Sequence, residues 1–142
     1  SPTRSRTGVE VPEMTRFTVA YWCVLAAALL PILCALLAKR GSFRGADNHD
    51  PRAWLARQSG WRAHANAAQA NSFEALPFFI GAVVIAHQIG APQAALDLLA
   101  CVFIVLRVSY VALYVGDMPT ARSMAWGLAF LVNIAILLLG WR

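Results

Sequence analysis

Polar and charged side chains interrupt two hydrophobic stretches of this chain. The first stretch carries Asn71 and Glu74, and the second carries Arg107, Tyr110 and Tyr114. A charged group in hydrocarbon is costly, so such groups usually face a protein interior or a water-filled cavity. A guanidinium binds a carboxylate through a fork of N–H groups, and a glutamate attracts an amine. These residue types therefore suit a small zwitterionic ligand that carries several carboxylates.

The composition indicates a membrane protein of one domain. Of the 142 residues, 59% are hydrophobic and 13% are charged, whereas about one quarter of residues are charged in soluble domains. The apolar residues fall into runs long enough to cross ~30 Å of hydrocarbon. We therefore expect an all-α integral membrane four-helix bundle. The net charge of +5 is not arranged as a basic stripe with aromatic residues, so we expect no nucleic-acid partner.

The hydrophobic runs predict four spans, at residues 17–38, 61–87 or 61–90, 93–114 or 93–116, and 122–140. Pro31 is expected to kink the first span, and residues 117–120 are expected to break the chain between the third and fourth. Residues 51–58 predict a short interfacial helix, with Trp54 and Trp61 at headgroup level. Residues 1–13 are interpreted as an added remnant or a disordered N-terminus, which leaves 14–142 as the membrane domain.

The basic residues predict the orientation of the spans. Loops that carry an excess of lysine and arginine stay in the cytoplasm. The third loop carries Arg122, and the second loop, around Gly90, carries no basic residue. The first loop is the most basic, with Lys39, Arg40, Arg44, Arg52, Arg57 and Arg62. We therefore expect loops one and three in the cytoplasm and both termini on the opposite side of the membrane.

This topology brings the two polar stretches to the same depth. The second span enters from the cytoplasm, so Asn71 and Glu74 lie near that side. The third span returns to the cytoplasm, so Arg107, Tyr110 and Tyr114 also lie near it. Spacings of three and four residues place each set on one face of its helix. The sequence therefore predicts a polar pocket between these spans at the cytoplasmic leaflet.

A second polar face of the second span carries Arg62, Asn66 and Gln69. A helix with two polar faces needs two polar environments. In a single four-span subunit, one of these faces would meet lipid or solvent, whereas in an oligomer it could complete a site at a subunit boundary. The pattern therefore favours a ring-like homo-oligomer.

Structural interpretations of the same residues remain open. Glu74 and Arg107 could form a buried ion pair whose role is to join two spans, because polar contacts between membrane helices are common. Tyr110 and Tyr114 could be interfacial aromatic residues. These alternatives predict no ligand.

The cysteines and histidines indicate neither a disulfide framework nor a metal site. Cys23, Cys34 and Cys101 all lie inside apolar runs, and an odd number of cysteines there is typical of small apolar side chains. The histidines lack the spacing of metal ligands. Asp47, His49 and Asp50 cluster in the first loop, but the turn that Asp50 and Pro51 favour accounts for this cluster without a metal.

With these residues the chain resembles the family of membrane-associated proteins in eicosanoid and glutathione metabolism, MAPEG. The resemblance covers residues 14–142. It rests on Gln-Ala-Asn-x-x-Glu-x-x-Pro at 69–77, on Arg-x-x-Tyr-x-x-x-Tyr at 107–114, and on Arg122 at the start of the fourth span. The chain is most similar to an uncharacterised bacterial branch, which the segments 48–52 and 60–63 also resemble. A location in the bacterial inner membrane is therefore expected.

The resemblance implies a homotrimer that binds glutathione between neighbouring subunits at the cytoplasmic leaflet. Arg122 would stabilise the glutathione thiolate, because a nearby guanidinium lowers the pKa of a thiol and the thiolate is the nucleophile. The thiolate would then attack an electrophilic or peroxidised hydrophobic substrate from the bilayer. The residues implied to bind glutathione are Gln69, Asn71, Glu74, Arg107, Tyr110 and Tyr114.

Three features depart from the glutathione-using members. Those members carry an arginine two residues before the glutamine that corresponds to Gln69, and this chain has Ala67 at that position. They often carry an aromatic residue directly after the glutamate that corresponds to Glu74, and this chain has Ala75 there. The eight-residue step from Tyr114 to Arg122 is one longer than in the eicosanoid-making members. Arg62 is a candidate to replace the missing arginine, although it lies on the other polar face.

Three functions follow from these observations. The first is a glutathione-dependent transferase or peroxidase that acts on hydrophobic substrates. The second is a non-catalytic membrane module that keeps the scaffold and binds lipids or partner proteins, which the change at Ala67 favours. A transporter is the third, and it is disfavoured because the spans lack a repeated half with paired broken helices.

Overall fold

Four long helices make up most of the described part of the chain, residues 16–141. In this computed structural model they are α1 (Val19–Lys39), α3 (Gly60–Gln88), α4 (Gln93–Val115) and α5 (Pro119–Leu138). The 3-10 helix η2 (Gly45–His49) and the short helix α2 (Pro51–Ala56) lie between α1 and α3. Each of the four long helices is long and apolar enough to cross a membrane. The expected all-helical architecture is therefore confirmed, and the interpretation of residues 1–13 falls outside the described residues.

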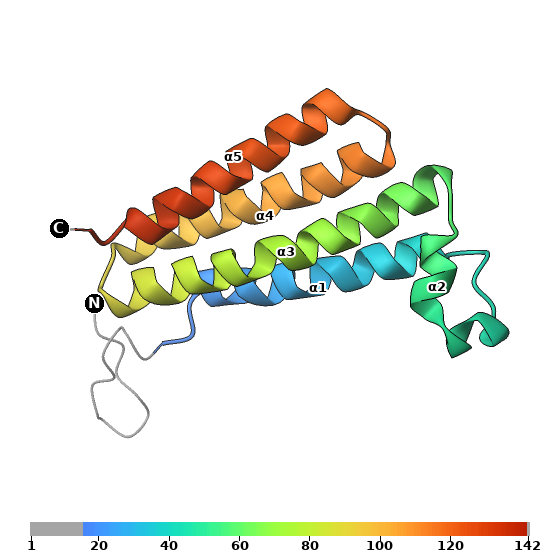
Figure 1. The fold of residues 1–142 in the computed structure, drawn as a ribbon. Helices are drawn as coiled ribbons and strands as arrows, with labels where there is room; N and C mark the ends of the chain where they lie inside the picture. The colour runs from blue at the N-terminus through green and yellow to red at the C-terminus, as the bar shows by residue number, and fades with distance from the viewer. Residues whose placement is uncertain (1–15, 142) are drawn as a thin grey trace, which may run out of the picture.

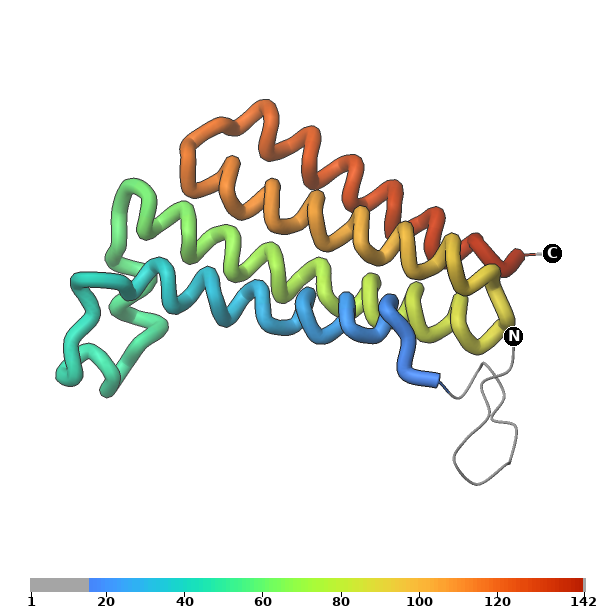
Figure 2. Tube along the Cα trace, turned by 180° about the vertical axis from the view of Figure 1, so that it is seen from behind, coloured from blue at the N-terminus to red at the C-terminus, as the bar shows by residue number. Residues whose placement is uncertain are grey.

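The long helices pack as two antiparallel pairs, α1 with α3 and α4 with α5, and α3 also contacts α4 and α5. Figure 1 shows that α1 begins and α5 ends at the same end of the bundle, on the left. The connections from α1 to α3 and from α4 to α5 lie at the other end, and Figure 2 shows the same arrangement from behind. Loops one and three therefore share one end, as the predicted orientation requires.

The ends of α3 and α4 are closed by the same type of turn. After α3, Gly90 has a φ of 74°, and the Ala91 amide donates to the Ala86 carbonyl at 3.0 Å. After α4, Asp117 has a φ of 55°, and the Met118 amide donates to the Leu113 carbonyl at 2.9 Å. A left-handed residue after the helix satisfies the last carbonyls in this way. Asp117 is therefore an exposed turn residue.

The start of α5 corrects one expectation from the sequence. Residues 117–120 were expected to break the chain before a span starting at 122, but α5 begins at Pro119. Proline is tolerated in the first turn of a helix, because the amide that it lacks would have no partner there. Arg122 therefore lies within the first turns of α5, and its amide donates to the Met118 carbonyl at 2.9 Å.

Small residues bring the helices close together. The buried core contains many alanines, among them Ala27, Ala82 and Ala100. In a membrane, small interface residues let neighbouring backbones approach and gain van der Waals contact. At the centre of the bundle, Phe79 of α3 stacks on Phe103 of α4, with ring centroids 4.1 Å apart. This packing fixes α3 against α4, which are the helices that carry most of the predicted site.

Arg62 joins the first turn of α3 to the end of α1. Its Nη1 donates to the carbonyls of Ala38 at 2.8 Å and Arg40 at 2.7 Å. The last carbonyls of a helix have no partners within the helix and carry partial negative charge, so a cation there is stabilising. Within the subunit the Arg62 side chain therefore binds the end of α1, and it does not replace the arginine that is missing at position 67.

The acidic residues of loop one form helix caps. Oδ1 of Asp50 accepts a hydrogen bond from the Ala53 amide at 3.1 Å and begins α2. Trp54 of α2 is 6% exposed and packs edge-on against Phe43 at 5.0 Å. The ring of Trp54 is thus enclosed by protein, whereas Trp61 is 41% exposed, and the position of both rings at headgroup level stays a prediction.

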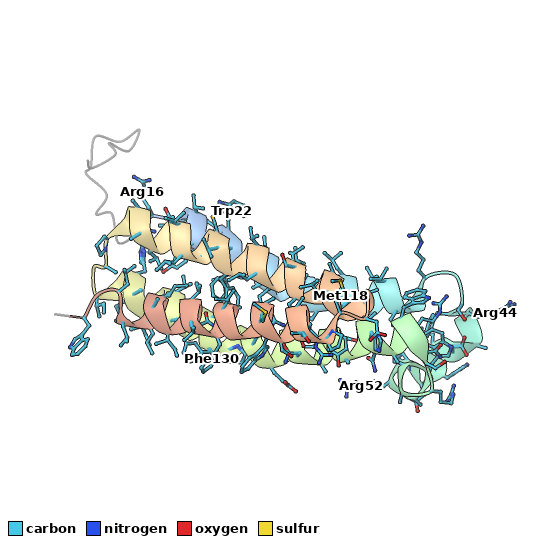
Figure 3. The ribbon with its side chains drawn as sticks, turned by 90° about the horizontal axis from the view of Figure 1, so that it is seen from above. Arg16, Trp22, Arg44, Arg52, Met118 and Phe130 are labelled. Carbon is cyan, nitrogen blue, oxygen red and sulfur yellow. The ribbon has the colours of Figure 1, made fainter. Side chains whose placement is uncertain are left out.

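The outer faces of the long helices are apolar. Large exposed side chains such as Leu33, Val105 and Leu131 lie on these faces. Figure 3 shows Trp22 and Phe130 along the bundle, with Arg44 and Arg52 at the end that carries α2. An apolar waist with charged residues at its ends is the pattern of an integral membrane protein.

Candidate functional site

Arg107 is the central charged residue of the site. It lies on α4 and is only 3% exposed. Its Nη2 donates to Oδ1 of Asn71 at 2.8 Å and to Oγ of Ser72 at 3.4 Å, both on α3. The guanidinium also lies 4.3 Å from the centroid of the Tyr110 ring. A buried charge needs such partners to offset its loss of hydration, so these contacts fix the position of the guanidinium between the two helices.

Arg122 forms a second cationic position beside the first. Its guanidinium lies 4.3 Å from the centroid of the Tyr114 ring. Tyr114 in turn packs edge-on against Tyr110, with centroids 5.7 Å apart. The tyrosines thus connect the two arginines, one from α4 and one from α5. Contact with a ring face orients a guanidinium and leaves N–H groups at its edge for an anionic ligand.

These residues line two adjacent cavities, which share Asn71 and Trp126. The outer cavity has a volume of about 270 Å³ and is lined by Asn71, Tyr110, Tyr114, Arg122, Ser123 and Trp126. The inner cavity has a volume of about 180 Å³ and is lined by Asn71, Glu74, Ala75, Phe78, Phe103, Arg107, Trp126, Ala129, Phe130 and Asn133. Six of the seven predicted site residues therefore meet in one region, between α3, α4 and α5.

Glu74 does not form the ion pair that the sequence left open. Within residues 16–141, the hydrogen-bond partners of the Arg107 guanidinium are the side chains of Asn71 and Ser72. Glu74 is exposed on α3 and lines the inner cavity. Its carboxylate therefore stays available to a positively charged group of a ligand.

Gln69 is the predicted site residue that the structure places elsewhere. It lines a separate cavity of about 310 Å³ on the other face of α3, together with Arg52, Leu55, Asn66, Ala70 and Phe73. Its Oε1 is buried without a hydrogen-bond partner among the described residues. Within one subunit, Gln69 and Asn71 therefore face different surroundings, as their positions on two polar faces predict.

Comparison of the sequence with known families identifies the family of this chain. A sequence model of the MAPEG family matches residues 19–141. The chain belongs to the MAPEG family. No curated protein and no solved structure matches it. The sequence resemblance to MAPEG is thereby confirmed over nearly the whole chain, and so is the membrane class of this MAPEG protein.

Several residues of the site escaped the sequence analysis. Ser72 was not singled out from the sequence, but its Oγ accepts a hydrogen bond from Arg107 and donates one to the Ala68 carbonyl at 2.7 Å. Asn133 of α5 is 3% exposed and belongs to the inner cavity. An amide within an apolar span is a detectable signal, because polar groups in such spans are uncommon. His64 also faces the site, with its ring 5.6 Å from that of Tyr114.

A second polar cluster lies at the opposite end of the bundle of this MAPEG chain. Oδ1 of Asp97 on α4 accepts from the Ala20 amide of α1 at 2.9 Å and from Nε2 of Gln93 at 2.7 Å. Oε1 of Gln93 in turn lies 3.2 Å from Nδ1 of His87 on α3. The carboxylate therefore satisfies an amide in the first turn of α1, where the helix dipole favours negative charge. This cluster joins three helices.

Proposed function

We propose that this MAPEG protein uses the thiolate of glutathione to conjugate or reduce hydrophobic electrophiles at the cytoplasmic leaflet. The observation that carries the proposal is the convergence of Arg107 and Arg122 on two adjacent cavities that also contain Glu74. The proposal includes a homotrimer in a bacterial inner membrane, with loops one and three in the cytoplasm.

The residues of the two cavities match the charges of glutathione. The tripeptide carries two carboxylates and one ammonium group. Arg107 and Arg122 are the cations for the carboxylates or the thiolate, and Glu74 is the anion for the ammonium. Asn71, which accepts from Arg107 at 2.8 Å, keeps amide N–H groups for the peptide part of the ligand. Tyr110 and Tyr114 define the wall between the two arginines.

Activation of the thiol is assigned to Arg122. Its guanidinium lies beside the outer cavity and is only half-buried. A positive charge at this position favours the charged sulfur, so the pKa of a bound thiol falls below its ordinary value of about 8.5. More of the bound thiol is then ionised at neutral pH, and the thiolate is the form that attacks an electrophile.

Gln69 supports the proposed trimer. Its Oε1 has no hydrogen-bond partner among the described residues, and it lines a polar cavity at the surface of the subunit. An unpaired buried amide oxygen costs free energy. A neighbouring subunit that brings its own thiol ligand to this face would satisfy the oxygen and complete the site.

The second candidate function is a non-catalytic membrane module that binds lipids or partner proteins. Two observations favour it: position 67 holds alanine instead of the expected arginine, and Arg62 is held at the end of α1. In this case Arg107 would act as a structural link between α3 and α4.

Titration of the purified protein with glutathione in detergent tests the first function. We expect saturable binding with ultraviolet thiolate absorbance at neutral pH. Arg122→Gln should abolish the absorbance at that pH while much of the binding persists, because the bound thiol then ionises only near ~8.5. Arg57→Gln, a change at an exposed arginine of loop one, is the matched control and should leave both signals intact.

Absence of saturable binding at millimolar glutathione would end the enzymatic proposal. The non-catalytic function gains support if the wild-type protein binds no thiol while Glu74→Gln and Arg107→Met variants assemble less well.

A further inference from the structure

We propose that the inner cavity binds an apolar ligand, about the size of a fused ring pair, that donates a neutral hydrogen bond to Asn133. This inference rests on the proposed function, since it names the chemical class of the hydrophobic reactant. The ligand class comprises aromatic or short-chain electrophiles that also carry a hydroxyl, hydroperoxide or N–H group.

Asn133 is an unpaired polar group deep in the bundle. It lies on α5 with 3% of its surface exposed. Its Oδ1 is buried, and among residues 16–141 no group donates a hydrogen bond to it. Buried polar atoms are almost always hydrogen-bonded, because an unsatisfied acceptor loses its hydration without compensation. A ligand that donates to this oxygen would remove the deficit.

The walls around Asn133 define the rest of the ligand. Phe78, Phe103, Ala129 and Phe130 line the same cavity. Its volume of about 180 Å³ compares with the ~150 Å³ apolar cavity that binds benzene in an engineered protein. An apolar body of one or two rings, or a chain of similar volume, therefore fits. A charged donor does not suit an end lined by hydrocarbon, because burial of an ion is costly.

The position of the cavity relates this ligand to the proposed thiol. The inner and outer cavities share Asn71 and Trp126, and Arg107 lies on the wall of the inner one. Phe130 lies on the outer surface of α5, as Figure 3 shows, and is 41% exposed. The inner cavity therefore has a rim that an apolar molecule can reach from the bilayer, and it adjoins the cavity assigned to glutathione.

Two probes with the same ring system test the inference. The probes are 1-naphthol, which donates a hydrogen bond, and 1-methoxynaphthalene, which does not. Their saturable quenching of tryptophan fluorescence is measured on the full chain in nanodiscs without glutathione. We expect 1-naphthol to bind the wild-type protein about tenfold more tightly than the ether, in keeping with one hydrogen bond in an apolar cavity. In Asn133→Leu, which removes the acceptor at similar volume, the two affinities should differ by less than twofold.

Two further variants separate this role from a structural one. Gln69→Leu removes a second unpaired buried amide, which lies on α3 outside the inner cavity, and should preserve the tenfold preference. Ala75→Leu narrows the inner cavity and should weaken both probes together. Thermal unfolding of each variant identifies any that do not fold. If Asn133→Leu fails to fold, Ala75→Leu tests the location of the ligand, and the preference of the wild-type protein for 1-naphthol tests the hydrogen bond.

Three outcomes would overturn the inference. They are equal binding of both probes by the wild-type protein, an unchanged preference in Asn133→Leu, and a loss of assembly in Asn133→Leu without a change in probe binding. The last would mean that a neighbouring subunit satisfies the amide. Because glutathione is absent, a negative result leaves the thiol proposal standing, and failure of glutathione binding leaves this result unaffected.

Discussion

Arg107 shows how one buried cation can serve both packing and binding. It contacts Asn71, Ser72 and Tyr110 on two helices. A guanidinium has five N–H donors in a rigid plane, and among residues 16–141 only one of its nitrogens, Nη2, donates hydrogen bonds to side chains. The same side chain can therefore hold α3 to α4 and still offer donors to the inner cavity.

An Arg107→Lys variant tests the importance of the planar geometry. Lysine keeps the charge, but it cannot stack on Tyr110 and reach Asn71 in the same way. We expect a loss of about 1–2 kcal/mol in the free energy of unfolding in detergent, the range for a disturbed hydrogen bond of a charged group. A variant as stable as the wild-type protein would show that charge alone, without the fork, holds the helices.

At the residue scale, the sequence predicted the members of the site better than their partners. Helical spacing and topology suffice to bring Asn71, Glu74 and Arg107 to one region. Spacing does not reveal that Ser72 and Asn71, rather than Glu74, accept from Arg107, because this depends on helix rotation and side-chain direction. Asn133 was missed because a lone amide in an apolar span has no periodic partner.

At the scale of elements, the helices are joined at both ends by polar contacts to helix termini. Arg62 of α3 satisfies the carbonyls at the end of α1, and Asp97 of α4 satisfies an amide at its start. The helix dipole favours a cation at the C-terminal end of α1, where Arg62 lies, and an anion at the N-terminal end, where Asp97 lies. The apolar middle of α1 can then pack by shape alone.

Amide hydrogen exchange at the start of α1 tests the role of Asp97. In Asp97→Leu the amide of Ala20 loses its acceptor, so we expect its exchange to be at least tenfold faster than in the wild-type protein, equivalent to about 1.4 kcal/mol of local opening. Asp97→Asn keeps an acceptor oxygen and should retain most of the protection. Equal exchange in all three proteins would mean that α1 starts without this bond.

The boundaries of the elements were predictable to within three residues. The first three spans begin and end close to the expected positions because hydrophobic runs and glycine or proline turns mark them. The fourth begins earlier than expected, since Pro119 starts α5 rather than preceding it. The position of Trp54 was not predictable, because its burial depends on contact with Phe43 across loop one.

At the scale of the whole molecule, the shared end of loops one and three predicts one orientation. Loops rich in arginine stay in the cytoplasm, so both termini should lie in the periplasm. We therefore expect activity from a reporter that works only in the periplasm when it is fused after Arg142. A companion fusion in loop one, near Arg57, should be inactive. Activity of a cytoplasmic reporter after Arg142 would reverse the proposed orientation and move the site to the other leaflet.

Assembly is the second property of the whole molecule. Phe73 is 45% exposed beside Gln69 on the face of α3 assigned to the subunit boundary. We expect Phe73→Ala to weaken the proposed trimer, because a large aromatic side chain contributes much of an interface. Leu98→Ala, on α4 with 65% exposure, is the control and should leave the trimer intact. Native mass spectrometry of the detergent complex distinguishes one chain from three. A wild-type protein of another stoichiometry would contradict the proposed assembly.

The bond between Asp97 and the start of α1 also has a consequence for biosynthesis. Its two residues are separated by 77 positions in the chain. At ~5–20 residues per second, a ribosome needs roughly 4–15 s to make the carboxylate after the amide that it binds. The first segment to enter the insertion machinery must therefore wait, with one end unsatisfied, until the third has been translated. Nascent chains that stop before the third segment should consequently be the ones that quality-control proteases remove.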